Sequence, residues 1–313
     1  MGVSSGRLTA LLTVAALAFA SGCGTSSGAG PGDATPHGDE NPAIPVVAST
    51  NVYGDIARQI GGDRVRVVSI ISDPAQDPHS YEASTRNQLE LSRAKVVVEN
   101  GGGYDDFVGK MLRGARNSGA EVVNAVDVSG RSPNGGGEFN EHVWYDLPTM
   151  GKLADRIADA LAATAPADAD VFRKNAATFR EKLTTLRDTE RQIRADHGGT
   201  AVAVTEPVPL YLIRASGLRN LTPSDFSEAV EEGDDVSART LRRTLDLFAD
   251  DRVRALVYNE QTSGPQTEKV EQAARARGIP VVPVTETLPP GEDYISWMTT
   301  NLDALRRALD TRP

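Results

Sequence analysis

Strand-like and helix-like segments alternate along most of this chain, and one long helical segment interrupts the alternation near its middle. Between residues 44 and 165, and again from residue 200 onward, short apolar runs precede segments with helical periodicity. Such alternation predicts parallel sheets covered by helices, as in α/β folds. We therefore expect two α/β lobes with central parallel sheets, one on each side of the long helix.

The central segment predicts a single long helix. Apolar residues such as Phe172, Phe179 and Ile193 recur with helical period from residue 169 to about residue 195. At 1.5 Å per residue this helix is roughly 40 Å long, which exceeds most globular helices. A coiled-coil arm is one interpretation, but strand patterns resume afterwards, which favours a rigid connection between two lobes. The expected parts are a first lobe at 44–165, a linking helix at 166–197 and a second lobe at 198–313.

The individual elements follow from the same patterns. Strands are expected at residues 44–49, 65–71, 95–99, 121–125, 200–205, 253–258 and 280–285. Helices are expected at residues 52–60, 85–94, 104–115, 147–163, 208–215, 237–248, 267–277 and 294–309. The stretch 218–229 is expected to be irregular. Ser237 or Asp235 is the expected cap of the helix at 237–248.

The first 22 residues predict a secretion signal. Arg7 provides a positive charge, and residues 8–20 form an apolar run that is too short for a convincing membrane span. Cys23, the only cysteine, directly follows small residues and resembles the lipidation site of bacterial lipoproteins. An ordinary signal peptide with an incidental cysteine is the alternative. A single cysteine excludes an intramolecular disulfide and a thiolate-cluster metal site.

Residues 23–43 predict a flexible tether. They are rich in Gly, Ser, Pro and Asp and offer almost nothing to bury, so we expect His37 within them to be solvated. The net charge of -10 argues against nucleic acid as a partner, because such binding requires basic surfaces.

Two of the four histidines lie in short polar segments. His79 belongs to Asp77-Pro78-His79-Ser80-Tyr81-Glu82, and His142 belongs to Asn140-Glu141-His142-Val143-Trp144-Tyr145-Asp146. Each segment follows a strand-like run and precedes a helix, where α/β proteins place ligand groups. Imidazole is the commonest metal ligand, so these segments suggest a metal site.

These landmarks resemble a known family, the metal-binding substrate-binding lipoproteins of bacterial ATP-binding-cassette (ABC) importers for zinc and manganese, also described as the periplasmic zinc-binding or TroA-like family. The resemblance covers essentially the whole chain after the tether. It is carried by the two histidine segments, Thr205-Glu206, Val284-Thr285-Glu286, the long helix and the run that begins at Tyr294.

The resemblance implies both a fold and a function. It implies two lobes bridged by one rigid helix, with a divalent metal held in the cleft between them. The expected function is capture of Mn²⁺ or Zn²⁺ and delivery to an ABC permease and its ATPase. The expected location is the outer face of the cell membrane, anchored through a lipid on Cys23, and we expect a monomer.

The resemblance also implies the ligands. Carried over position by position, they are His79 and His142 from the first lobe and Glu206 and Glu286 from the second. The third position is histidine in many zinc binders and glutamate in many manganese binders. The fourth is usually aspartate, so Glu286 departs from the pattern by one methylene.

Several neighbouring carboxylates complete this expectation. Glu260 and Glu292 are rivals of Glu286 as the fourth ligand. Asp77 and Asp146 are expected to orient the imidazole rings through their N–H groups, because they are near the histidines in sequence.

The donor set does not determine which metal ion binds. Two imidazoles and two carboxylates form a site of intermediate hardness, closer to manganese than a three-histidine site, yet zinc binds such donors at least as strongly. The loop at 129–137 is rich in Gly and Pro and lacks the histidines found in many zinc-binding members. The donor set favours manganese, and zinc and iron are the alternatives.

A secreted metallo-hydrolase and a surface adhesin are two alternative classes of function. A secreted metallo-hydrolase would keep an open metal position and a general base, whereas four protein ligands fill the sphere here and no His-Glu-x-x-His motif occurs. A surface adhesin would use the metal only structurally, for cell adhesion. We expect a binding protein and not an enzyme. Because the linking helix is stiff, we expect little closure on binding, with loop rearrangement near His142 or Glu206.

Overall fold

The computed structural model describes residues 43–73, 81, 84–132, 139–250 and 252–311, all within one compact unit. The predicted signal segment, Cys23, most of the tether with His37, and both Asp77 and His79 lie outside the described residues. No helix in the described part of the chain is long and apolar enough to cross a membrane.

The first lobe is built on a four-stranded parallel sheet with the strand order β2-β1-β3-β4. Its strands are β1 (Ile44–Thr50), β2 (Val65–Ile71), β3 (Val96–Glu99) and β4 (Glu121–Asn124). Its helices are α1 (Asn51–Gly61), the 3-10 turn η1 (Gly62–Arg64), α2 (Thr85–Arg93), α3 (Asp106–Gly114) and α4 (Ala125–Ser129).

The central strands β1 and β3 bury apolar residues on both faces of this sheet, whereas the edge strands β2 and β4 include exposed residues. Along β3, Val96 and Val98 belong to the apolar core on one face, together with α1, and Val97 belongs to a second core against α2 and α3. Residues that alternate along a strand point to opposite faces. Parallel sheets covered by helices on both faces have this pattern.

The second lobe repeats the plan with the strand order β6-β5-β7-β8, again all parallel. Its strands are β5 (Ala201–Val204), β6 (Arg219–Asn220), β7 (Leu256–Asn259) and β8 (Val281–Val284). Its helices are α7 (Leu210–Ala215), α8 (Ser224–Glu231), α9 (Ala238–Ala249) and α10 (Pro265–Ala276).

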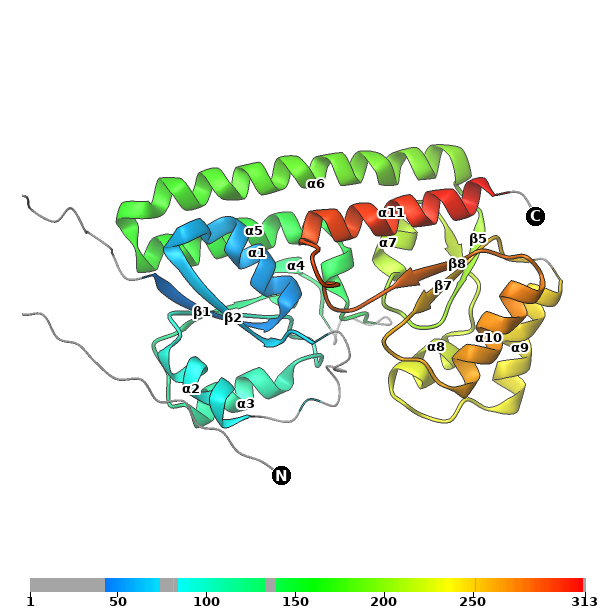
Figure 1. Ribbon diagram of the computed structural model, residues 1–313, viewed down its shortest axis with the longest axis horizontal. Coiled ribbons are helices and arrows are strands. Elements are labelled where there is room, and N and C mark those ends of the chain that lie inside the picture. The colour runs from blue at the N-terminus through cyan, green and yellow to red at the C-terminus, as the bar shows by residue number, and fades with distance from the viewer. Residues whose placement is uncertain (1–42, 74–80, 82–83, 133–138, 251, 312–313) are drawn as a thin grey trace, which may run out of the picture. The chain divides into compact units, whose positions relative to one another are not determined.

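Helix α5 (Leu147–Thr164) packs on the first lobe and is followed by the 3-10 turn η4 (Pro166–Asp168). The long helix α6 (Ala169–His197) then leads to the second lobe, where α11 (Tyr294–Asp310) packs against β8. The 29-residue α6 packs against α1 and α5 and against α11, which returns alongside it from the end of the chain (Figure 1). One apolar core includes Val46 of the first sheet, Phe179 of α6 and Val202 of the second sheet. The predicted fold, two α/β lobes joined by one long helix, is confirmed.

The expectation of an irregular stretch at 218–229 was wrong. Strand β6 is only two residues long, and helix α8 begins directly after Pro223 with its apolar Phe226 fully buried. Elements this short give a weak periodic signal. The cap predicted for α9 is Ser237, whose hydroxyl accepts a hydrogen bond from Thr240 N at 3.1 Å.

Candidate metal centre

The carboxyl ends of the second sheet gather three polar side chains. Glu206 lies two residues beyond β5, Asn259 is the last residue of β7, and Glu286 lies two residues beyond β8. Because these adjacent strands are parallel, their ends meet at one edge of the sheet, with Asn259 between the two glutamates. Both carboxylates are almost completely buried, with 1% and 2% of their surface exposed.

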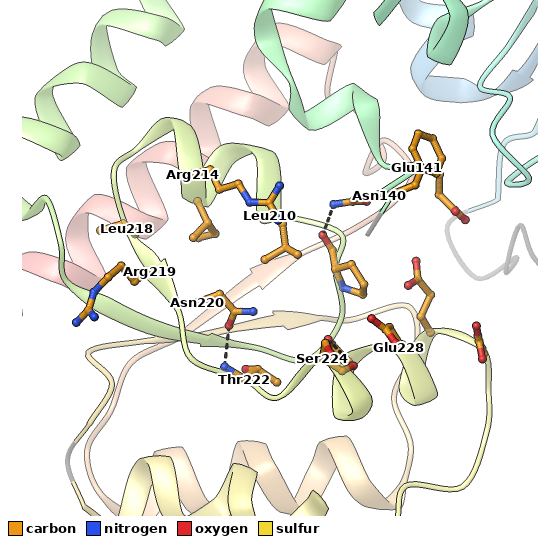
Figure 2. A pocket seen from close by; sticks show the side chains of 16 residues that line it. Asn140, Glu141, Leu210, Arg214, Leu218, Arg219, Asn220, Thr222, Ser224 and Glu228 are labelled. Carbon is orange, nitrogen blue, oxygen red and sulfur yellow. Dashed lines mark hydrogen bonds between the residues drawn. The ribbon is translucent and has the colours of Figure 1, made fainter. Parts of the chain in front are cut away.

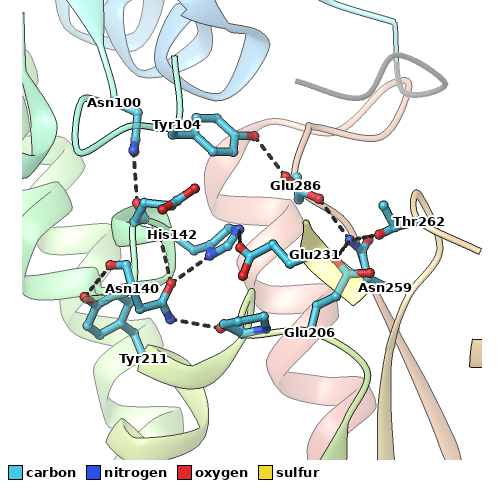
Figure 3. A network of polar contacts seen from close by, with 12 residues as sticks. Asn100, Tyr104, Asn140, His142, Glu206, Tyr211, Glu231, Asn259, Thr262 and Glu286 are labelled. Atoms are coloured by element: carbon cyan, nitrogen blue, oxygen red, sulfur yellow. Dashed lines mark hydrogen bonds and ion pairs between the residues drawn. The ribbon is translucent and has the colours of Figure 1, made fainter. Parts of the chain in front are cut away.

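Asn259 holds the two glutamates together. Its Nδ2 lies 2.7 Å from Glu206 Oε2 and 2.9 Å from Glu286 Oε1, as Figure 3 shows. Its Oδ1 accepts a hydrogen bond from Gln261 N at 3.1 Å, which fixes the amide with the nitrogen toward the carboxylates. Two buried like charges on one amide repel each other, and a cation bound between them would relieve that repulsion.

His142 faces this pair from the first lobe. It immediately precedes the 3-10 turn η3 (Val143–Tyr145) and is fully buried, with its ring edge-on to Trp144 at a centroid separation of 4.9 Å. Asn140 orients the ring, because its Oδ1 lies 2.7 Å from His142 Nδ1 and its Nδ2 donates to Pro207 O at 2.9 Å. An amide oxygen only accepts, so Nδ1 donates and Nε2 is the nitrogen turned toward the second lobe.

A third glutamate, Glu231, meets His142 Nε2. It is the last residue of α8, its Oε1 lies 3.2 Å from Nε2, and 16% of its side chain is exposed. Burial, followed by the negative charges of Glu141, Glu206 and Glu286, raises the pKa of Glu231 to about 9. A carboxyl group among other carboxylates therefore keeps its proton at neutral pH unless a cation replaces it.

The sequence analysis did not identify Glu231. It lies in the acidic run Glu231-Glu232-Gly233-Asp234-Asp235, which has the composition of a solvated turn. The usable signal was Pro223 followed by Phe226 and Val230, an apolar pair at helical spacing that predicts a short helix ending at the acidic run.

Tyr104 connects the lobes at this point. Its hydroxyl donates to Glu286 Oε2 at 3.1 Å, and its ring lies 5.9 Å from that of His142. Burial, and next the charge of Glu286, raise the pKa of Tyr104 well above its usual value, so the phenol remains a donor. The first lobe thus supplies a neutral hydrogen-bond donor to a carboxylate of the second.

The other candidate residues lie elsewhere. Glu260 is exposed, and Glu292 is half-buried with its Oε1 3.4 Å from the hydroxyl of Thr300. Asp146 lies beside Arg131, 3.3 Å from its Nη2, and accepts a hydrogen bond from the Thr149 hydroxyl; Asn140 is the group that contacts the His142 ring. His197 ends α6 and lies 2.9 Å from Asp310.

The described donors do not yet form a closed coordination sphere. Within the described ranges, no three His, Cys, Asp or Glu side chains are close enough together to hold one ion. His142 with Glu231, and Glu206 with Glu286, form two neighbouring pairs, and His79 lies outside the described residues. Imidazole and carboxylate are nevertheless donors that Mn²⁺ and Zn²⁺ both accept.

A cavity of about 580 Å³ adjoins the pairs, and Figure 2 shows its lining. Its walls come from α7, β6, α8 and the loop before His142, and Glu231 is one of the lining residues. Acidic side chains also line it, namely Glu141, Glu228 and Glu232. Glu231 therefore borders both the cavity and the His142 ring.

Comparison with known proteins gives a family match over most of the chain. Residues 46–308 match the sequence model of the family described as "Zinc-uptake complex component A periplasmic". The manganese-binding lipoprotein MntA of Bacillus subtilis is 28% identical over 85% of this chain and 85% of its own. A putative metal-binding protein of Treponema pallidum is 24% identical over 85% of this chain and 87% of its own.

Solved structures share the fold. A deletion mutant of ZnuA with zinc bound superposes with a TM-score of 0.72 at 22% identity, covering 87% of this chain and 100% of the other. The periplasmic zinc-binding protein TroA from Treponema pallidum superposes with a TM-score of 0.69 at 21% identity, covering 86% and 100%.

Proposed function

We propose a function for this chain on one premise: it belongs to the family of periplasmic zinc-uptake components whose sequence model it matches over residues 46–308. The chain captures a divalent transition metal, Mn²⁺ or Zn²⁺, as cargo and delivers it to an ABC importer. The family is one of metal-binding transport proteins and not an enzyme family. Metal capture without turnover is therefore the proposed activity.

One observation carries this proposal. Two buried glutamates from neighbouring strand ends share the amide of Asn259, and a buried histidine from the other lobe faces them. The ligand set is proposed as His142 through Nε2, Glu206, Glu286 and His79. The separation of the donors into two pairs implies that side chains move together when the ion enters.

The proposed site serves a carrier better than a catalyst. The ion would be held by side chains from both lobes, so binding and release would depend on the relative position of those side chains. A hydrolytic site would instead keep a coordination position for water with a base beside it. The ion here is cargo, and its chemistry is exchange of protein ligands.

The site is tested by Glu206→Ala. Loss of this buried carboxylate is expected to weaken binding of Mn²⁺ and Zn²⁺ by at least about a hundredfold, beyond the range seen for outer-shell partners. Titration calorimetry on metal-stripped protein measures the affinities. Glu260→Ala, an exposed glutamate at the end of the neighbouring strand, is the matched control and is expected to bind as the parent does. Unchanged affinity in Glu206→Ala would remove Glu206 from the site.

Competition between Zn²⁺ and Mn²⁺ for the protein tests which of the two ions it prefers. Protein purified without added ions is analysed for bound metal, and Zn²⁺ is then titrated against protein saturated with Mn²⁺. Because zinc binds nitrogen and oxygen donors at least as strongly as manganese does, displacement is expected at comparable concentrations.

We also propose that a lipid on Cys23 anchors the chain to the outer face of the cell membrane, where it meets an ABC permease driven by its ATPase. Support comes from the lipoprotein names of relatives such as MntA and FimA of Streptococcus parasanguinis, and from the small residues that precede Cys23. Mass spectrometry of the mature N-terminus checks the anchor; an unmodified cysteine would remove it.

A further inference from the structure

Glu231 is placed where a metal ligand would have to be. His142 Nδ1 is engaged by Asn140, so an ion can approach this ring only at Nε2. Glu231 Oε1 lies 3.2 Å from that nitrogen. An ion bound to Nε2 therefore either displaces this carboxylate or is bound by it.

The distance fits two donors on one ion. Nitrogen and oxygen donors bind such metals at about 2.1 Å, which puts two ligands of one ion about 3.0 Å apart at right angles and about 3.4 Å apart at the tetrahedral angle. The 3.2 Å between Nε2 and Oε1 lies between these values. The two atoms are therefore separated by a distance that one ion can span.

The surroundings of Glu231 favour a cation. Its side chain is largely buried and lies within the influence of four other carboxylates, those of Glu141, Glu206, Glu286 and Glu232. A divalent ion at Nε2 would be attracted by all of them. Because Glu231 also lines the adjoining cavity, its carboxylate has room to adjust on one side.

We infer that Glu231 is a fifth metal-binding side chain, contributed by α8 and coordinating the ion beside His142 Nε2. The inference rests on the proposed function, since it concerns the same ion. Among the described residues, the proposed donors are then the imidazole of His142 and three carboxylates from the second lobe, those of Glu206, Glu231 and Glu286.

A third carboxylate affects the choice of metal. Zinc is satisfied by four donors in a tetrahedron, whereas manganese takes more donors and suits carboxylate oxygen. Removal of the Glu231 carboxylate is therefore expected to weaken the binding of Mn²⁺ more than the binding of Zn²⁺. The residue would act as a determinant of selectivity as well as of affinity.

The test compares Glu231→Gln with Glu232→Gln in the full folded chain. Glutamine keeps the size of the side chain and its capacity for a hydrogen bond with His142, and it removes the anionic donor. The control changes the same charge at the next, exposed residue. Affinities for Mn²⁺ and Zn²⁺ are measured by calorimetry, and Co²⁺ absorption reports coordination number, because its visible bands strengthen when fewer ligands bind.

The expected result is a loss of Mn²⁺ affinity of at least about tenfold in Glu231→Gln, a smaller loss for Zn²⁺, and stronger Co²⁺ bands. Unchanged or tighter Mn²⁺ binding would mean that Glu231 merely pairs with His142 until the ion displaces it. A loss that Glu232→Gln reproduces, or that leaves the Co²⁺ bands unchanged, would be electrostatic only. Either result overturns the ligand role.

Failure of the proposed function itself gives a different pattern. In that case the parent protein binds none of the three ions. That result contradicts the proposed function, and with it the ligand role of Glu231. If the parent binds metal and Glu206→Ala does not, the site stands whatever Glu231→Gln shows.

Discussion

Two asparagines orient the proposed donors: Asn140 contacts the ring of His142, and Asn259 contacts Glu206 and Glu286. His142, Glu206 and Glu286 were predicted as ligands from the resemblance to a known family. The structure places Glu206 and Glu286 just beyond the ends of parallel strands of one sheet. The roles of Asn259 and of Asn140, which begins the His142 segment, were not predicted, because they depend on which atoms lie opposite the two amides in the folded chain. An asparagine in a loop is usually a turn residue, so sequence alone gave no reason to select either.

Another buried carboxyl group, on α6, gives a prediction for stability. Glu190 is 5% exposed, none of the described residues gives its Oε1 a hydrogen bond, and burial raises its pKa from 4.5 to about 7. The folded protein thus retains this proton more tightly than the unfolded chain. The stability that this provides is present below pH 4.5 and is lost as the pH rises from 4.5 through 7.

Glu190→Gln is therefore expected to stabilise the protein by about 2–3 kcal/mol at pH 8 and to have little effect at pH 4. Urea unfolding at both pH values measures this difference. Glu181→Gln changes an exposed residue of the same helix and should shift stability by less than about 0.5 kcal/mol at either pH. An equal gain for Glu190→Gln at pH 4 and pH 8 would contradict the burial argument.

The length of a helix determined whether it could be predicted from the sequence. Helix α6 was expected within two residues of its ends, because its apolar positions repeat over many turns and break only at the Gly-Gly pair that follows it. Helix α8 was missed, because eight residues cover barely two turns and its last residue merges into an acidic run. The missed element is also the one that brings Glu231 to the site.

The apolar face of α6 gives a prediction at this scale. Phe179 is 1% exposed, and its ring lies 5.8 Å from that of Tyr294 on α11. Phe179→Ala is expected to lower the free energy of unfolding by about 3–5 kcal/mol through the cavity it leaves. Val171→Ala, at an exposed position of the same helix, should cost less than about 0.5 kcal/mol. Urea unfolding measures both, and equal losses would contradict the proposed packing role of α6.

For the whole molecule, the contacts between lobes limit how far it can open. The hydroxyl of Tyr145 donates to Thr285 O at 2.8 Å, that of Tyr294 donates to Trp144 O at 2.6 Å, and that of Tyr211 donates to Asn140 O at 2.7 Å. All three are hydrogen bonds between a first-lobe loop or turn and the second half of the chain. A wide hinge motion would break them together.

We expect the radius of gyration to remain the same within error when metal binds. Small-angle scattering of metal-stripped and metal-saturated protein measures it, and hydrogen exchange should locate any change at the loop before His142 or at the end of α8. A large contraction on binding would show that the inter-lobe hydrogen bonds do not hold the lobes in place.

The position of Glu206 and Glu286 just beyond fixed strands has one more consequence. The hydrogen-bonded ladders between β5 and β7 and between β7 and β8 fix where the two side chains start, so the length of each side chain sets how far its oxygens reach. Exchanging glutamate for aspartate draws those oxygens back by one carbon–carbon bond, about 1.5 Å. Because the backbone positions are fixed, the number of methylene groups in each acidic side chain determines how far apart the carboxylate oxygens lie. Exchange of glutamate and aspartate can therefore adjust the size of the ion that fits without altering the fold.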